Sequence, residues 1–111
     1  RNSAADKHYL GFVDGEGLVA VLDLIERYPQ ADGIYIGFFM MKKAVQGRGV
    51  GSALIGELLD ELREEGFRRV RLAVDRGNPQ SKAFWEKNGF ALTGEEVPHN
   101  ASAYLPMERA L

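Results

Sequence analysis

A cluster of glycines between two different periodic patterns constrains this chain more than any other feature. Gly47, Gly49 and Gly51 fall within residues 46–52, after an apolar run and before a helical repeat. Because glycine has no Cβ atom, successive backbone N–H groups in such a loop can converge on an anion. The first turn of the following helix adds unpaired N–H donors and about half a positive charge. The segment therefore predicts a phosphate site built from main-chain atoms.

The patterns on both sides of this loop predict a strand and a helix. Residues 34–41 are apolar on both alternating sets, which is typical of a strand in the middle of a sheet with cover on each face. Strict alternation places Ile34, Ile36, Phe38 and Met40 on one face, and Tyr35, Gly37, Phe39 and Met41 on the other. After the loop, an amphipathic helix is predicted by the spacing of Val50, Leu54, Ile55, Leu58, Leu59 and Leu62, with Gly66 as its natural end.

The rest of the chain predicts further strands and a second, shorter helix. Two apolar runs, 8–13 and 18–25, joined by a turn at 14–17, indicate a β-hairpin. Residues 70–75 predict a strand, residues 80–88 after Pro79 predict a helix, and 90–97 and 103–111 predict closing strands around a loop at 98–100. We therefore expect one domain over residues 1–111, of the α/β (α+β) class, with a central mixed, mostly antiparallel sheet, two helices and the order β-β-β-α-β-α-β-β.

Composition argues against several classes of function. The net charge of -2 disfavours a broad non-specific nucleic-acid surface, which needs a basic excess. The chain has no cysteine and only two histidines, far apart in the sequence, so no metal site is predicted. No apolar run approaches the ~18 residues of a membrane span. We therefore expect a cytoplasmic protein without nucleic-acid or membrane partners.

Four interpretations of the glycine loop compete. A Walker loop needs a lysine followed by serine or threonine after its glycines, and the loop contains no lysine. A dinucleotide fingerprint needs Gly-x-Gly-x-x-Gly, but Ser52 or Leu54 stands where the third glycine should be. A merely flexible connection is less attractive, because glycine costs conformational entropy unless the backbone needs it.

The fourth interpretation rests on a resemblance to a known family. Gln46-x-x-Gly49-x-Gly51, after a strand and before an amphipathic helix, resembles the acyl-CoA-binding motif of the Gcn5-related N-acetyltransferase superfamily. Residues 78–90 are similar to the family's second signature helix, which ends in a Gly-Phe pair, and residues 107–111 are similar to its last strand. The resemblance covers roughly residues 8–111 and implies the acyl-CoA N-acyltransferase fold.

The resemblance also implies how acetyl-CoA, the acyl donor, would bind. The pyrophosphate would lie next to Gln46, on the amides of Gly47, Arg48, Gly49, Val50, Gly51 and Ser52. Arg48 would lie beside the phosphates, or be an exposed, solvated side chain. The pantetheine arm would pair like an added strand with the backbone near Phe39 and Met41, and the Met41 N–H would polarise the thioester carbonyl. The far side of the arm would be contacted by Asn78 and Ser81, while Trp85 packs against the arm or fills the core.

The reaction implied is transfer of an acetyl group from acetyl-CoA to a primary amine, by direct attack within a ternary complex. The family's leaving-group acid is often a tyrosine on the second signature helix, where this chain has Trp85, whose indole is no acid at neutral pH. Asp23 is the best candidate for a base, because a carboxylate within an apolar strand is costly unless it has a partner or faces water. We expect Asp23 to line the substrate cleft and to accept the amine proton, through water. The alternative is an aspartate hydrogen-bonded to a neighbouring strand or facing solvent.

Two further expectations concern the N-terminal region and the class of function. Family members usually carry a strand and one or two helices before the first hairpin, whereas about seven residues precede it here, so we expect a trimmed or minimal version. The sheet region left uncovered would recruit a partner subunit, with a homodimer as the candidate assembly. The alternative function is a non-catalytic acyl-CoA-binding sensor or scaffold, and a plain interaction domain without a ligand is the third.

Overall fold

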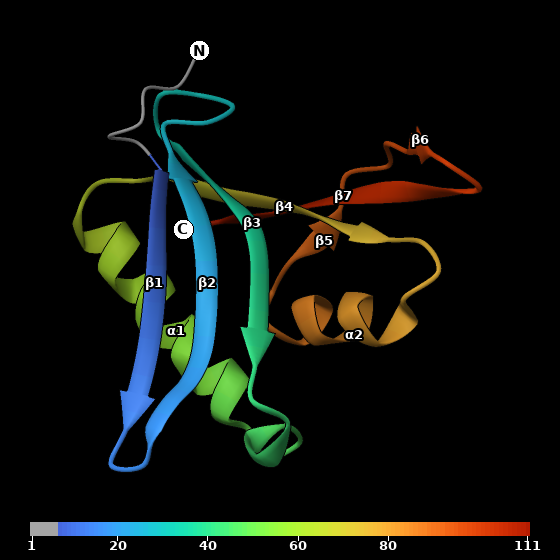
Figure 1. Cartoon of the computed structure of the whole chain (residues 1–111). Coiled ribbons are helices and arrows are strands. Elements are labelled where there is room, and N and C mark those ends of the chain that lie inside the picture. The colour runs from blue at the N-terminus through green and yellow to red at the C-terminus, as the bar shows by residue number, and fades with distance from the viewer. Residues whose placement is uncertain (1–6) are drawn as a thin grey trace.

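The computed structural model describes residues 7–111, which form one sheet with two α-helices (Figure 1). In chain order the elements are β1 (Lys7–Asp14), β2 (Gly17–Glu26), β3 (Gly33–Met41), the 3₁₀ turn η2 (Lys43–Val45), α1 (Val50–Glu64), β4 (Arg69–Asp75), α2 (Pro79–Lys87), β5 (Ala91–Leu92), β6 (Val97–His99) and β7 (Ser102–Ala110). The predicted hairpin, central strand and both helices are confirmed, with ends that differ by a residue or two.

The strands lie in the order β1-β2-β3-β4-β7-β5, and β6 pairs with the first residues of β7. All neighbouring pairs are antiparallel except β3 and β4, which are parallel and are connected through α1. A parallel pair needs such a crossover, because both of its strands start at the same end of the sheet. The expectation of a mixed, mostly antiparallel sheet with two helices is confirmed.

The closing region differs from the prediction, because residues 90–97 do not form one strand. They contribute to two short strands, β5 and β6, and the predicted loop at 98–100 lies partly in β6. Thr93 N donates a hydrogen bond to Pro106 O, but proline has no N–H to return the second bond of this pair. The β5–β7 ladder therefore stops there, and Gly94, with a φ of 93°, turns the chain away.

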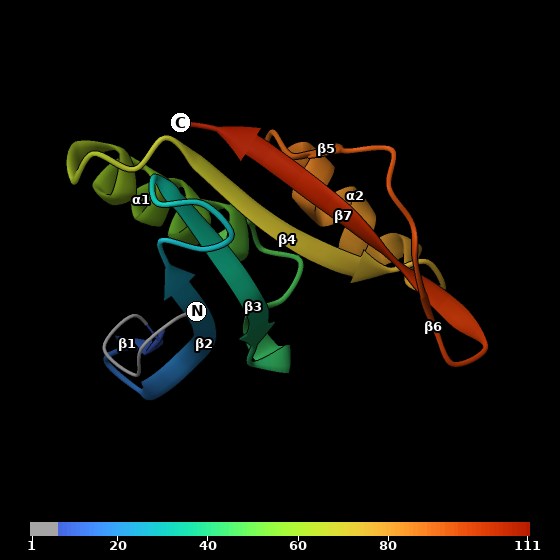
Figure 2. The same ribbon diagram turned by 90° about the horizontal axis from the view of Figure 1, so that it is seen from above.

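Both helices cover the same face of the sheet, as Figure 2 shows. The core joins Ile55 and Leu59 of α1 to Leu22 of β2 and Leu72 of β4, all at most 2% exposed. Within residues 7–111 no helix lies over the other face, so the expectation of cover on both faces of the central strand is wrong for this part of the chain. Neither helix in this range is long and apolar enough to cross a membrane.

A β-bulge in β3 interrupts the alternation of its side chains. Leu24 of β2 lies opposite Ile36, but the preceding residue, Asp23, lies opposite Phe38. Gly37 is therefore the extra residue on β3. A Cβ on Gly37 would lie 3.1 Å from the Asp23 Cγ, so this side chain position is already occupied by its neighbour.

The bulge decides which residues of β3 reach the core. Beyond it, Phe39 and Met41 lie opposite buried residues of β2, and therefore on the helix-covered face. Phe38 and Met40 point to the uncovered face, with exposed fractions of 40% and 63%. The predicted face of alternate residues from Ile34 to Met40 is thus wrong, because one inserted residue shifts a period of two by one position.

Candidate functional site

Strands β3 and β4 are paired only where they begin, and they separate beyond that point. The parallel ladder joins residues 33–35 to 69–71, and no strand among the described residues pairs with the remainder of β3 on that side. Figure 1 shows the two strands diverging, with α2 below the opening. Residues 36–41 of β3 therefore keep one free hydrogen-bonding edge.

The peptide groups of Phe39 and Met41 point into this opening. Lys42 N donates to Val19 O over 2.8 Å, which makes these two residues a hydrogen-bonded pair of the β2–β3 ladder. In an antiparallel ladder such pairs alternate with pairs whose peptide groups point away from the partner strand, and Phe39 and Met41 belong to the second class. The Met41 carbonyl accepts a hydrogen bond from Gln46 Nε2 over 3.0 Å, which leaves both N–H groups and the Phe39 carbonyl for a ligand.

A cleft of about 690 Å³ lies at this opening, between β3, the glycine loop and α2. Of the residues predicted to hold acetyl-CoA, the cleft brings together Phe39, Met41, Gln46, Gly47, Asn78, Ser81 and Trp85. It is also lined by five residues that sequence analysis missed, namely Met40, Gln80, Ala83, Phe84 and Lys87. The signal that could have found three of them is helical spacing, because Gln80, Phe84 and Lys87 recur four and three positions apart.

The glycine loop presents unpaired amides at the start of α1. Gly47 and Gly49 have φ values of 78° and 77°, in the left-handed region, and a Cβ on either would meet no atom within 4 Å. Gly49 is the N-cap of α1, and no side chain caps this helix. In the described part of the chain, no acceptor takes a hydrogen bond from the N–H groups of residues 47–52. These donors and the helix dipole suit an anion such as a diphosphate.

Five residues that sequence analysis placed at the pyrophosphate do not line the cleft, namely Arg48, Gly49, Val50, Gly51 and Ser52. Gly51 is where α1 approaches β3, since a Cβ there would lie 2.8 Å from Met41 Sδ. Ser52 Oγ accepts a hydrogen bond from Asn88 Nδ2 over 3.1 Å, which ties α1 to the end of α2. The side-chain positions of Gly51 and Ser52 therefore serve packing, and only their main chain remains for a ligand.

Helix α2 forms the opposite wall of the cleft. Asn78 Oδ1 accepts a hydrogen bond from Ser81 N over 3.1 Å, and this cap fixes where the helix begins. Trp85 is 6% exposed, and its ring centre lies 6.0 Å from that of Phe39. Trp85 therefore belongs to the core, as one of its two predicted roles required, and it also lines the cleft.

Asp23 lies outside the cleft, on the uncovered face of β2. It sits at the bulge, opposite Phe38 and against Gly37. Its Oδ1 is buried and has no hydrogen-bond partner in the described part of the chain. This oxygen is therefore neither bonded to a neighbouring strand nor open to solvent, and the carboxylate stands beside the opening between β3 and β4.

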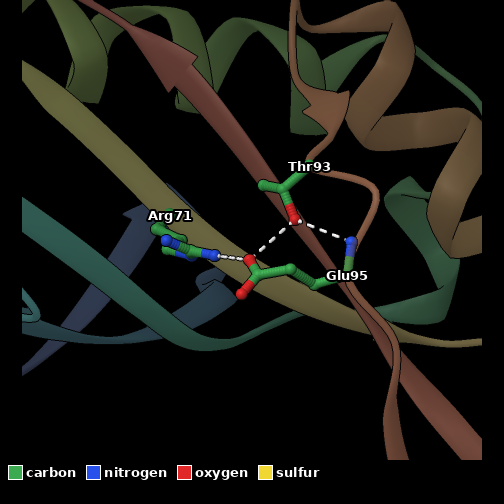
Figure 3. Close-up of polar contacts among 3 residues, drawn as sticks. All are labelled: Arg71, Thr93 and Glu95. Atoms are coloured by element: carbon green, nitrogen blue, oxygen red, sulfur yellow. Dashed lines mark hydrogen bonds and ion pairs between the residues drawn. The ribbon is translucent and has the colours of Figure 1, made fainter.

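Polar contacts bridge the uncovered face on the β4 side of the opening (Figure 3). Arg71 pairs with Glu95, whose Oε1 also accepts a hydrogen bond from Thr93 Oγ1 over 2.9 Å. Burial raises the pKa of Tyr35, and the neighbouring Tyr28 raises it further, while Arg71 acts in the opposite direction. Tyr35 therefore stays neutral at neutral pH and is no base for chemistry at the opening.

The sequence is similar to those of known acetyltransferases. The Acetyltransferase (GNAT) family model matches residues 1–90. A mycothiol acetyltransferase from Corynebacterium glutamicum is 33% identical over 92 residues, which are 83% of this chain and 31% of that protein. A 5-NmdU N-acetyltransferase from Pseudomonas phage PaMx11 is 25% identical over 95 residues, which are 86% of this chain and 66% of that protein. The chain thus spans about a third of the length of the mycothiol acetyltransferase that it matches.

Solved structures of acetyltransferases share the fold. An acetyltransferase from Thermus thermophilus has a TM-score of 0.80 at 25% identity, over 97% of this chain and 66% of that one. A GCN5-related N-acetyltransferase from Kribbella flavida has a TM-score of 0.78 at 28% identity, over 96% of this chain and 68% of that one. Because the family model covers most of the sequence and the glycine loop opens α1 beside a separating pair of parallel strands, this chain belongs to the GNAT acetyltransferase family.

Proposed function

We propose that this domain transfers an acetyl group from acetyl-CoA to a primary amine. The observation that carries the proposal is the succession of two binding features along the chain. The free edge of β3 leads into a loop whose amides have no acceptor among the described residues. A donor with an amide-containing arm and an anionic diphosphate suits both features, and membership of the family supports acyl transfer as the chemistry.

Acetyl-CoA would lie along β3 with its diphosphate at the start of α1. The amides of residues 47–52 would hold the diphosphate, and the arm would add to the free edge of β3 through the peptide groups of Phe39 and Met41. Ser81 and Phe84, on the α2 wall of the cleft, would contact the other side of the arm.

Other predicted binding residues would act by positioning. The Gln46 side chain holds the Met41 carbonyl and so fixes the loop relative to the free edge. Asn78 caps α2, and it would shape the wall of the cleft through that cap. Arg48 is exposed within the loop, where its charge would lie beside the phosphates.

The transfer needs a neutral amine and a polarised thioester carbonyl. An alkylammonium, with a pKa near ~10.4, first gives up one proton, and its nitrogen then attacks the thioester carbon. The C–N bond forms, the C–S bond of the tetrahedral oxyanion breaks, and the nitrogen loses a second proton. The CoA sulfur leaves as a thiolate with a pKa near ~8.5 and takes up a proton from water.

The place of Asp23 suggests which N–H group polarises the thioester. The family resemblance implies this role for the Met41 N–H, but the Phe39 N–H points into the same opening. Asp23 lies opposite Phe38, and Met41 is three residues farther along β3, which is about 10 Å in a strand. If Asp23 accepts the amine proton through water, the thioester carbonyl belongs at the Phe39 N–H, and the Met41 N–H binds farther along the arm.

A non-catalytic acyl-CoA-binding module is the second candidate, and Trp85 is the observation that favours it. The family resemblance implies that this residue stands where a tyrosine often serves as the leaving-group acid, and its ring is buried against Phe39. Such a module would bind acetyl-CoA equally well but would release no thiol when an amine is offered.

Thermal unfolding with and without acetyl-CoA tests the binding step. At 100 times its dissociation constant, the ligand stabilises a protein by about 2.7 kcal/mol, so we expect the midpoint to rise by several degrees. Pantetheine alone, which lacks the diphosphate, is the matched control and should raise the midpoint less. No shift with acetyl-CoA at any concentration would contradict both candidate functions.

Release of free thiol from acetyl-CoA separates the two candidates. An enzyme should release thiol only when a primary amine is present, in proportion to the amide formed. Binding without amine-dependent release across a panel of alkylamines, amino sugars and polyamines would favour the non-catalytic module. Mass measurement of the product checks that nitrogen, and not water, received the acetyl group.

The location and assembly expected from the sequence complete the proposal. We propose a cytoplasmic enzyme, and a homodimer remains the candidate assembly. Light scattering of the purified chain measures its mass directly, and a mass of one chain would contradict the dimer without touching the proposed chemistry.

A further inference from the structure

The uncovered face carries a carboxylate whose buried oxygen has no hydrogen-bond partner among residues 7–111. Asp23 Oδ1 is buried, without a hydrogen bond or an ion pair in the described part of the chain. A buried anionic oxygen that no protein group satisfies is costly unless a ligand or an ordered water fills the place. The bulge at Gly37 holds this carboxylate against β3, at the opening between β3 and β4.

Apolar side chains surround this carboxylate on the same face. Tyr9 of β1 and Phe38 of β3 are the register partners of Asp23 on its two sides, and Met40 lies two residues beyond Phe38. All three are exposed, by 71%, 40% and 63% respectively. Neighbouring strands lie about 4.8 Å apart, so these side chains flank the carboxylate closely enough to contact one ligand.

The arginines of this face do not compete for the carboxylate. Arg71 pairs with Glu95, and Arg69 lies 3.7 Å from Asp32, so each cation of β4 has its own acidic partner. Asp23 therefore offers a negative charge that no residue among 7–111 neutralises. A cation from outside is the group that it would attract.

Met40 connects this patch to the cleft. It is exposed on the uncovered face, and it also lines the cleft in which Phe39 and Met41 present their N–H groups. An amine held at Asp23 would therefore lie at the edge of the acyl-donor site and would approach from the face opposite the two helices.

We propose that the acceptor is a small arylalkylamine, with its ammonium group on Asp23 and its ring against Tyr9, Phe38 and Met40. This inference rests on the proposed function and names the substrate class of that same site. The rings favour a flat apolar body and also stabilise the ammonium through cation–π contact. Acceptors with several charges or hydroxyl groups gain little from such a surface, which ranks polyamines and amino sugars below arylalkylamines.

Calorimetric titration with phenethylammonium tests binding without any catalysis. Asp23→Asn keeps the shape of the side chain and should weaken binding at least about tenfold, because it removes the charge partner. Phe38→Ala should weaken binding roughly three- to tenfold, the usual effect of one aromatic contact. Asp60→Asn, on the exposed surface of α1, and Val97→Ala, exposed on β6, are the matched controls and should change nothing.

Ethylamine separates the ring from the charge. It should bind roughly three- to tenfold more weakly than phenethylammonium, and Phe38→Ala should weaken it less than it weakens phenethylammonium, because ethylammonium loses only the cation–π contact and no ring contact. Equal binding of the two amines, or binding of phenethylammonium that is indifferent to both Asp23→Asn and Phe38→Ala, would overturn the inference.

Acetyl transfer distinguishes a failure of this inference from a failure of the proposed function. We expect kcat/KM for phenethylamine to exceed that for spermidine and glucosamine, and Asp23→Asn to leave the thermal shift with acetyl-CoA unchanged. Faster transfer to spermidine or glucosamine would refute the proposal that the acceptor is an arylalkylamine, but it would still support the proposed acetyltransferase function. A protein that shows no shift with acetyl-CoA would instead refute the proposed function, and the calorimetric result would still decide whether the amine binds.

Discussion

The two halves of β3, residues 33–35 and 36–41, are built from similar residues but differ in their pairing with β4. Residues 33–35 are paired with β4, Ile34 and Tyr35 are paired with β2 as well, and Ile34 is fully buried beneath the helices. Within the described part of the chain, residues 36–41 pair with no strand except β2, and the second edge of this half faces the cleft at residues 39–41. One strand thus supplies both a part of the sheet that has strands on both sides and a free edge for a ligand.

The difference teaches how a sheet can bind an extended molecule without an exposed outer strand. An unpaired edge on the outside of a sheet invites aggregation. Here the free edge lies inside the sheet, between two strands that stay joined at one end, and α2 shields it from below. The joined half, residues 33–35, fixes the position of β3 relative to β4. The open half, residues 36–41, has peptide groups that remain for hydrogen bonds with a ligand.

The largest expected effect comes from a substitution in residues 33–35, the half of β3 that is joined to β4. Ile34→Ala removes a fully buried side chain where three strands meet, and should lower the free energy of unfolding by about 2–5 kcal/mol. Met40→Ala, in the open half and 63% exposed, is the control and should stay within about 0.5 kcal/mol. Chemical denaturation measures both, and equal losses would refute the contrast between the halves.

A smaller effect should follow from a change where the open half meets α1. Gly49→Ala forces a residue with a side chain into a left-handed conformation, which costs roughly 1–2 kcal/mol, although the added Cβ meets no atom. The distorted loop should also weaken acetyl-CoA binding, seen as a smaller thermal shift. Gly56→Ala, with equally free space in the middle of α1, should instead stabilise by about 0.5–1 kcal/mol and leave the shift unchanged.

Gln46→Ala should have a weaker effect on stability and a selective effect on binding. It removes the hydrogen bond to the Met41 carbonyl, worth about 0.5–1.5 kcal/mol, and so releases the loop from the free edge. We expect the dissociation constant for acetyl-CoA to rise while that for pantetheine changes little. If both ligands lose affinity equally, the loop and the edge are not coupled in this way.

The smallest expected effect is on the unfolding free energy at alkaline pH, and it concerns Tyr35 in residues 33–35 of β3. Burial raises the pKa of Tyr35 above its usual value of 10.0, so the folded protein keeps a proton that the unfolded chain has already lost. The stability from this group is therefore present below pH 10 and is lost as the pH rises through the folded pKa. Tyr35→Phe should flatten the decline in unfolding free energy above pH 10, and an unchanged slope would contradict the burial argument.

Much of the fold was predictable because its signals are local. Three signals depend on residues that are close together in the sequence. They are the helical spacing of α1, the turn between β1 and β2, and the glycines before Val50. Backbone preferences and side-chain periodicity act over the same short range. Gly47 of the cleft was predicted from these local signals, whereas Gln46 was predicted from the resemblance to the acetyltransferase family.

The predictions that were wrong depend on strands that are distant in the sequence. The end of β5 is set by Pro106, which lacks the N–H that Thr93 would need, and the two residues meet only in the folded sheet. The change of phase in β3 likewise comes from its register with Asp23 on β2. Neither the end of β5 nor the bulge in β3 can be recognised from the periodicity of the strand in which it occurs.

The amino-acid sequence by itself determined the family, the order of most elements and the loop of free amides at the start of α1. Only the tertiary structure decided that β3 and β4 separate, that Phe39 and Met41 turn their peptide groups into the opening, and that no described residue pairs with Asp23 beside it. The physical reason is the distance along the chain over which each interaction acts. Residues that are adjacent in the sequence set the local conformation, whereas pairing between distant strands decides which strand edges and which charged groups are left without a partner.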